Sequence, residues 1–132
     1  MTLLYQDGLR FGEQSMGHVE VKVSLSNLEA GTKMDEKGLV DIGATLTVLP
    51  RKLADALQLS ITAQSKAMTA GGPVSIDLSD VNVEIAGKAA TVRVAISDVV
   101  DRVLIGVTTL ETLGLTVDPL TGQLKESYYL LY

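Results

Sequence analysis

The chain has 132 residues, of which 46% are apolar, so it suits one domain with a core of aliphatic side chains. Its net charge of −5 argues against a general nucleic-acid binder, and the absence of cysteine excludes disulfides and thiolate metal sites. No apolar run has membrane-spanning length and the first residues lack a signal-peptide pattern, so we expect a cytoplasmic protein.

The first third of the chain predicts two strands and a helix. Apolar and polar residues alternate over residues 19–25, as in a half-buried strand. Residues 26–37 are polar and contain a glycine, which is typical of a turn. A second strand is expected to begin at Leu39 and to run into Asp41. Pro50 suits the start of a short helix over the following "RKLADALQL".

The middle of the chain predicts a hairpin and a break in a strand. Residues 61–69 are expected to be extended, and "AGGP" at 70–73 is a turn with two adjacent glycines. Apolar residues then alternate over 74–78, and again over 81–85 in the opposite phase. The change of phase at Ser79-Asp80 predicts a bulge or a corner.

The last third predicts two more strands, a second helix and a turn. The strands are expected at 92–96 and 103–105, and the helix over "VTTLETLGL", with a stop near Gly114. A turn follows at 117–122, and the last ten residues are expected to be extended. Many short strands with two short helices indicate a mainly-β domain, either a barrel or a folded sheet.

Two short segments form a faint internal repeat. "VDIGATL" at 40–46 and "VLIGVTT" at 103–109 share an apolar pair, a glycine and a threonine at matching places, and each leads to a helix. Asp41 of the first copy corresponds to Leu104 of the second. One chain therefore supplies one acid, not two.

The segment "DIGATLTVL" at 41–49 resembles the active-site loop of retropepsin-like aspartic proteases, in which Asp-Thr/Ser-Gly-Ala is followed by a threonine and apolar residues. Two further marks of that family occur in the same order. They are a glycine-bearing hairpin at 68–75 and "LIG" at 104–106 before a short helix. The resemblance extends from about residue 19 to 124 and is closest to the small single-domain prokaryotic relatives of the retroviral enzymes.

This resemblance implies a closed, barrel-like retropepsin fold over residues 18–132, with one or two short helices. Residues 1–17 lie outside it and form an N-terminal extension, either mobile or an arm. The implied protein is a homodimeric aspartic endopeptidase that cleaves peptide or protein substrates. It needs no metal or cofactor and binds neither nucleic acid nor a membrane.

In the implied mechanism each subunit supplies one catalytic Asp41. Two carboxylates held about 3 Å apart share a proton, because they cannot both ionise cheaply. The ionised member then acts as a base on a water molecule, and the protonated member polarises the scissile carbonyl. A symmetric interface would bring the two carboxylates together.

The resemblance also implies which residues contact the substrate. They are Gly43, Ala44, Thr45, Gly71, Gly72 and Ile105. The hairpin that carries the two adjacent glycines would act as a flap that closes over the peptide and excludes water. The side chains of Val48, Leu49 and Ile105 would line apolar pockets.

The main departure from the family pattern is Ile42. Ile42 stands where a threonine or serine hydroxyl would reach across the dimer, and each donor left without a partner costs about 1–3 kcal/mol. Three outcomes stay open: an active enzyme with an apolar dimer seam, a weakened enzyme, or a binding or assembly domain without the chemistry. An unrelated β-barrel that binds a small ligand is a further alternative.

Overall fold

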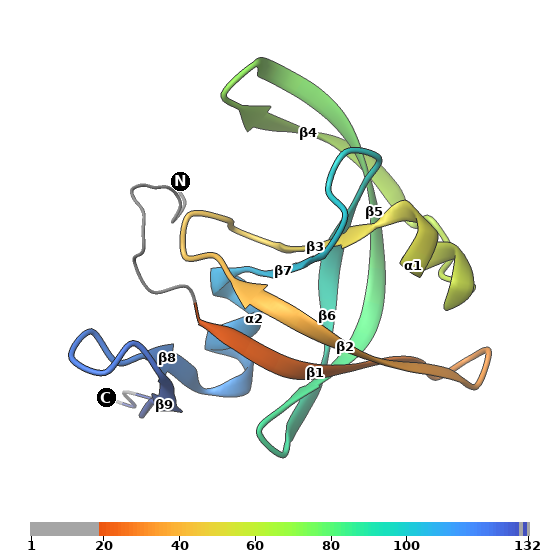
Figure 1. Cartoon of the computed structure of the whole chain (residues 1–132). Coiled ribbons are helices and arrows are strands. Elements are labelled where there is room, and N and C mark those ends of the chain that lie inside the picture. The colour runs from red at the N-terminus through yellow and green to blue at the C-terminus, as the bar shows by residue number, and fades with distance from the viewer. Residues whose placement is uncertain (1–18, 130, 132) are drawn as a thin grey trace.

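The computed structural model describes residues 19–129 and 131 (Figure 1). The predicted extension at residues 1–17 lies outside the described residues. The elements in chain order are β1 (Glu20–Asn27), β2 (Thr32–Val40), β3 (Thr47–Pro50), α1 (Arg51–Ala56), β4 (Ala63–Thr69), β5 (Gly72–Ile85), β6 (Lys88–Ser97), β7 (Val103–Ile105), α2 (Val107–Leu113), β8 (Leu115–Val117) and β9 (Leu124–Glu126).

Six of the strands close into a barrel. Their order in the sheet is β1-β2-β7-β3-β6-β5, and an additional pairing between β1 and β5 joins the two ends. Strand β4 pairs only with β5 in the described sheet, so these two form a hairpin that extends beyond the barrel. This arrangement confirms the prediction of a mainly-β, closed, barrel-like fold with two short helices.

Strand β7 lies between two strands from the first half of the chain. It runs parallel to β2, where Leu39 pairs with Leu104, and antiparallel to β3, where Val48 pairs with Leu104. The chain leaves β2, makes the loop at residues 41–46 and returns as β3 on the other side of β7. The chain thus passes from one side of β7 to the other. We call this place the crossing, and it puts the loop next to the end of β7.

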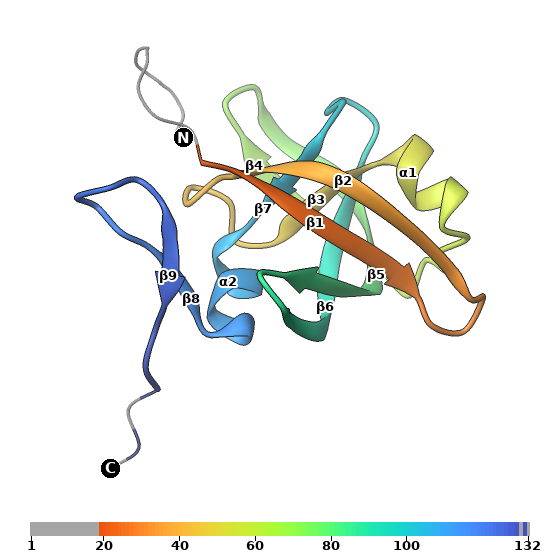
Figure 2. The same cartoon turned by 60° about the horizontal axis from the view of Figure 1, so that its bottom comes forward.

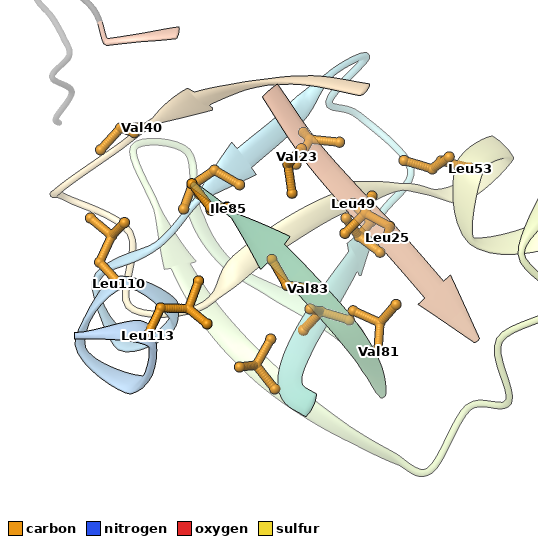
Figure 3. Packing of buried hydrophobic residues seen from close by; sticks show 14 of the residues in the cluster. Val23, Leu25, Val40, Leu49, Leu53, Val81, Val83, Ile85, Leu110 and Leu113 are labelled. Atoms are coloured by element: carbon orange, nitrogen blue, oxygen red, sulfur yellow. The ribbon is translucent and has the colours of Figure 1, made fainter. Parts of the chain in front are cut away.

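The core is aliphatic, as the composition predicts (Figure 3). The fully buried side chains with the largest volume are Leu25, Leu49, Leu57, Ile85, Ile96 and Ile105. Burying one such side chain contributes about 1.5–3 kcal/mol to folding. Their alternation along each strand places one face of every barrel strand toward the shared interior.

The predicted turn at residues 26–37 is wrong over most of its length. Strand β2 begins at Thr32, and its ladder with β1 is continuous from Asn27–Thr32 to Glu20–Leu39. Side chains in the first part of β2 are exposed or only half-buried, so its sequence lacks an apolar face. Backbone pairing with β1, rather than burial, makes this polar segment a strand.

Of the bulge or corner predicted at Ser79-Asp80, the bulge is wrong, and the change of partner in β5 at this point fits the corner. The register between β5 and β6 is unbroken from Asp77–Ile96 to Ile85–Lys88. On its other edge β5 changes partner, from β4 up to Leu78 to β1 from Asn82 onward. Ser79 is 1% exposed and donates a hydrogen bond to the carbonyl of Ser60, so a polar residue occupies an inward position and interrupts the apolar pattern.

The β4–β5 hairpin confirms the predicted turn. It is paired from Ala63–Leu78 to Thr69–Gly72, and Gly72 has a φ of 108°, which a residue with a side chain rarely adopts. Figures 1 and 2 show that the tip of this hairpin and the loop at residues 41–46 lie toward the same side of the barrel.

The two predicted helices are present as short α1 and α2, after Pro50 and before Gly114. No helix in the part of the chain that the structure describes has the length and apolar character needed to span a bilayer.

Candidate active site

Asp41 lies at the end of β2, where its backbone and its carboxylate are both held. Its N–H donates to the carbonyl of Ile105 over 2.9 Å, which extends the β2–β7 ladder by one bond. Its Oδ1 accepts a hydrogen bond of 2.9 Å from the N–H of Gly43, and its carbonyl accepts one of 3.1 Å from Ala44. The loop is a tight turn around a half-buried acid.

The second copy of the internal repeat supports this loop directly. The N–H of Val107 donates to the carbonyl of Ala44 over 2.9 Å, and the N–H of Thr108 donates to the carbonyl of Thr45 over 3.0 Å. The hydroxyl of Thr108 bonds the same carbonyl over 2.7 Å. The two related segments are therefore bonded to each other, and the second fixes the position of the first.

Two buried hydroxyl groups stabilise the crossing from the interior of the barrel. The side chains of Thr47 and Thr109 are both 0% exposed, and their Oγ1 atoms lie 2.6 Å apart. The N–H of Gly106 donates to Thr47 Oγ1 over 3.0 Å. This pair was hard to predict from the sequence, because the presence of each threonine in an apolar stretch was its only indication. A buried polar pair that is fully bonded favours one arrangement of the crossing.

Close backbone contact also defines this crossing. A Cβ atom placed on Gly106 would lie 2.4 Å from the carbonyl carbon and oxygen of Leu46, and 2.8 Å from the nitrogen of Thr47. Glycine is therefore required there for space, although the φ of −87° is one that any residue can adopt. The loop and the start of α2 touch at this point.

A row of half-buried aliphatic side chains crosses the outer face beside the loop. Leu39, Leu104 and Val48 are register partners on three adjacent strands, and their neighbours along each strand point into the core. Ile105 and Leu49 are both 0% exposed. The prediction that these two side chains line substrate pockets is therefore wrong, because β7 and β3 turn them inward. Leu104 and Val48 occupy the outer face instead.

The remaining predicted site residues fall into two groups. Gly43, Ala44 and Thr45 lie in the loop around Asp41, whereas Gly71 and Gly72 form the tip of the β4–β5 hairpin. The loop residues are brought together with Asp41 by the bonds described above. The role of the hairpin glycines stays a prediction.

Ile42 is unusually exposed for its type. Its side chain is 62% exposed in the single chain, directly after Asp41.

The described residues contain no group of three or more His, Cys, Asp or Glu side chains arranged to hold a metal ion.

Comparisons with known proteins agree with this geometry. The profile of the family described as aspartyl protease matches residues 19–109. No curated protein sequence matches the chain.

Among solved structures, the chain is similar to the EIAV protease complexed with the inhibitor HBY-793, with 18% identity and a TM-score of 0.60, over 79% of this chain and 95% of that one. A retropepsin-like aspartic protease from Rickettsia conorii is 21% identical with a TM-score of 0.56, over 78% and 76% of the two chains. The protease of Simian Foamy Virus (mac) is 22% identical with a TM-score of 0.51, over 71% and 93%. At these identities the similarity concerns the fold.

Proposed function

The chain belongs to the aspartyl protease family, and on that premise we propose that it is an endopeptidase that works as a homodimer with one Asp41 from each subunit. The observation that carries the proposal is the Asp41 loop, in which a single carboxylate is held at the crossing of β2, β7 and β3. The matching position of the internal repeat is Leu104, so the second carboxylate has to come from another chain.

Paired carboxylates account for the chemistry without a cofactor. Two Asp41 side chains about 3 Å apart share one proton, because the repulsion of two negative charges raises the pKa of one of them. The ionised carboxylate takes a proton from water, which attacks the peptide carbonyl while the protonated carboxyl donates to its oxygen. The pair titrates as a unit, so neither subunit has a permanent role.

The proposed substrate is an extended peptide lying between the loop and the β4–β5 hairpin. Gly43, Ala44 and Thr45 leave the loop open for a close approach of the peptide backbone. The hairpin tip at Gly71-Gly72 would close over it as a flap and exclude water. The aliphatic row that includes Leu104 would contact apolar substrate side chains.

The dimer is tested by the oligomeric state. We expect sedimentation to detect a dimer at micromolar concentration, and Ile42→Glu to shift it to monomer, since a two-fold interface would bring the two new charges close together. Leu28→Glu is the matched control, because Leu28 is 71% exposed on the distant β1–β2 turn. A wild-type protein that stays monomeric at high micromolar concentration would remove the paired active site.

A second candidate function is a binding or assembly domain on the same fold, and Ile42 is the observation that favours it. Its side chain cannot make the hydrogen bond expected of a threonine at this position, and a symmetric dimer would lose that bond twice. The exposed isoleucine could still bury apolar area against its counterpart, which would recover part of the loss. Membership of the aspartyl protease family excludes the unrelated ligand-binding barrel.

Restoring the hydroxyl separates the two candidates. If the wild type is an enzyme, Ile42→Thr should raise kcat/KM by no more than about tenfold, the equivalent of one or two hydrogen bonds at the seam. Ile61→Thr, at an isoleucine that is 45% exposed before β4, is the control and should change nothing. Peptidase activity that appears only in Ile42→Thr would instead establish the binding or assembly domain.

A further inference from the structure

One arginine connects three separate parts of the fold by charged hydrogen bonds. Arg51 donates to Asp98 through Nε over 2.9 Å and through a terminal nitrogen over 3.1 Å, which is a two-pronged contact. Its other terminal nitrogen lies 2.8 Å from Asp77 Oδ2. The amide of Gln64 donates to the second oxygen of Asp77 over 2.9 Å. We call these four residues the Arg51 clamp.

The clamp lies where the β4–β5 hairpin leaves the barrel. Gln64 and Asp77 are register partners on β4 and β5, one pair beyond the base pair Ala63–Leu78. Arg51 comes directly after β3, the strand that continues from the Asp41 loop. Asp98 comes directly after β6, in the connection that leads to β7. The clamp therefore ties the root of the hairpin to both segments that flank the crossing.

Arg51 does not stabilise α1, the helix that it begins. Arg51 is the first residue of α1, where the helix dipole disfavours a positive charge. Its side chain is 33% exposed and that of Asp77 is 19% exposed, so the contact is shielded in part from water. A planar guanidinium can bond two carboxylates at once, which the point charge of a lysine does poorly.

We propose that Arg51 is a positioning residue that holds the β4–β5 hairpin at a fixed angle over the Asp41 loop and thereby sets how firmly substrate is bound. This inference rests on the proposed function, in which the hairpin closes over a peptide. Everything beyond the clamp, from residue 65 to 76, is exposed or half-buried and is held mainly by its own ladder. The orientation of this segment therefore depends on its root.

The size of the effect distinguishes a positioning role from a role in global stability. The loss of a partly exposed ion pair removes too little free energy to unfold a domain. Segments that open locally have low free energies of opening, so the same amount shifts their opening several-fold.

The ionisation of the two acids supports an intact clamp at neutral pH. The hydrogen bond from Gln64, followed by that from Arg51, lowers the pKa of Asp77, and the Arg51 bond lowers the pKa of Asp98. Both acids are thus ionised above their ordinary pKa of 3.8, and their stabilising contribution is lost as the pH falls through their lowered values in the folded chain.

Amide hydrogen exchange tests the proposal without any need for catalysis. We expect Arg51→Gln to speed exchange at the hairpin amides from 65 to 76 by about threefold to tenfold, while exchange in β1 and β6 stays unchanged. The exchange rate of Arg51→Lys should fall between those of the wild type and Arg51→Gln, because one ammonium group cannot bond both acids well.

Arg102→Gln is the matched control. Arg102 donates to Glu20 over 2.8 Å in another arginine–carboxylate pair, which joins β1 to the residue before β7 rather than to the hairpin. It should leave hairpin exchange at the wild-type rate. Hairpin exchange that is equal in wild type and Arg51→Gln would overturn the proposal, as would equal acceleration by Arg102→Gln.

Kinetics give a second, separable readout. If the chain cleaves peptides, Arg51→Gln should raise KM several-fold with a smaller change in kcat, because substrate holding is affected more than the chemical step. A chain that cleaves nothing would count against the proposed function alone, since the exchange experiment still decides the role of Arg51. Normal exchange with normal cleavage would reject the clamp and leave the proposed function standing.

Discussion

Asp41→Asn is expected to lower kcat/KM for any cleaved peptide by about a thousandfold or more. In a homodimer the substitution removes both carboxylates, so no group is left to take the proton from water or to donate one to the carbonyl. Asparagine has nearly the same shape and can still accept the N–H of Gly43, as Oδ1 of Asp41 does over 2.9 Å. The fold and the dimer should therefore survive, which thermal unfolding and sedimentation would verify.

Asp55→Asn provides the matched control for that loss. Asp55 is an exposed aspartate on α1, away from the loop, and its replacement should leave cleavage within a factor of about two. The measurement is a time course on a mixed peptide library from acid to neutral pH, with cleavage sites read by mass spectrometry. Unchanged cleavage by Asp41→Asn would assign the observed activity to another protein or to another site.

Gly106→Ala is expected to destabilise the domain by about 3 kcal/mol or more, a large effect for one methyl group. The new Cβ would overlap the backbone of Leu46 at 2.4 Å, and backbone atoms cannot rotate out of the way as a side chain can. Relief requires the loop to move away from α2. That movement would weaken the bond from Gly106 to Thr47 and would displace Asp41.

Gly31→Ala is the control that separates steric overlap from the ordinary cost of replacing glycine. Gly31 lies in the β1–β2 turn with a φ of 74°, and a Cβ there would meet nothing within 4 Å. Gly31→Ala should lower the free energy of unfolding by about 1–2 kcal/mol, the cost of holding an alanine in the left-handed backbone conformation. Urea unfolding of both variants measures the difference. A smaller loss for Gly106→Ala than for Gly31→Ala would mean that the crossing is more pliable than its contacts indicate.

Local sequence signals predicted the elements that depend on neighbouring residues. The alternation in β1, Pro50 before α1 and the adjacent glycines at the hairpin tip act over a few residues, and the structure confirms each element. Local patterns left a barrel and a folded sheet both open, and the resemblance to retropepsin-like proteases, carried by three marks in order, implied the closed barrel.

Elements that depend on partners outside their own residues were predicted less well. The first part of β2 is polar and forms a strand only because β1 pairs with it. Ser79 interrupts an apolar pattern without a bulge, because its hydroxyl reaches the carbonyl of Ser60 in a separate segment. In each case the stabilising partner lies in another strand or segment, so the residues of the element alone do not reveal it.

The features of the candidate site also fall into those that local sequence predicts and those that depend on packing. Residue types in "DIGA" and in its degenerate repeat were enough to predict the candidate acid and the single carboxylate per chain. The packing of the strands was needed to establish that Leu104, and not Ile105, faces outward, and that Thr47 and Thr109 meet in the interior. A strand of three residues has no preferred face of its own. Its neighbours β2 and β3 orient it, and they are brought to it by the crossing of the chain.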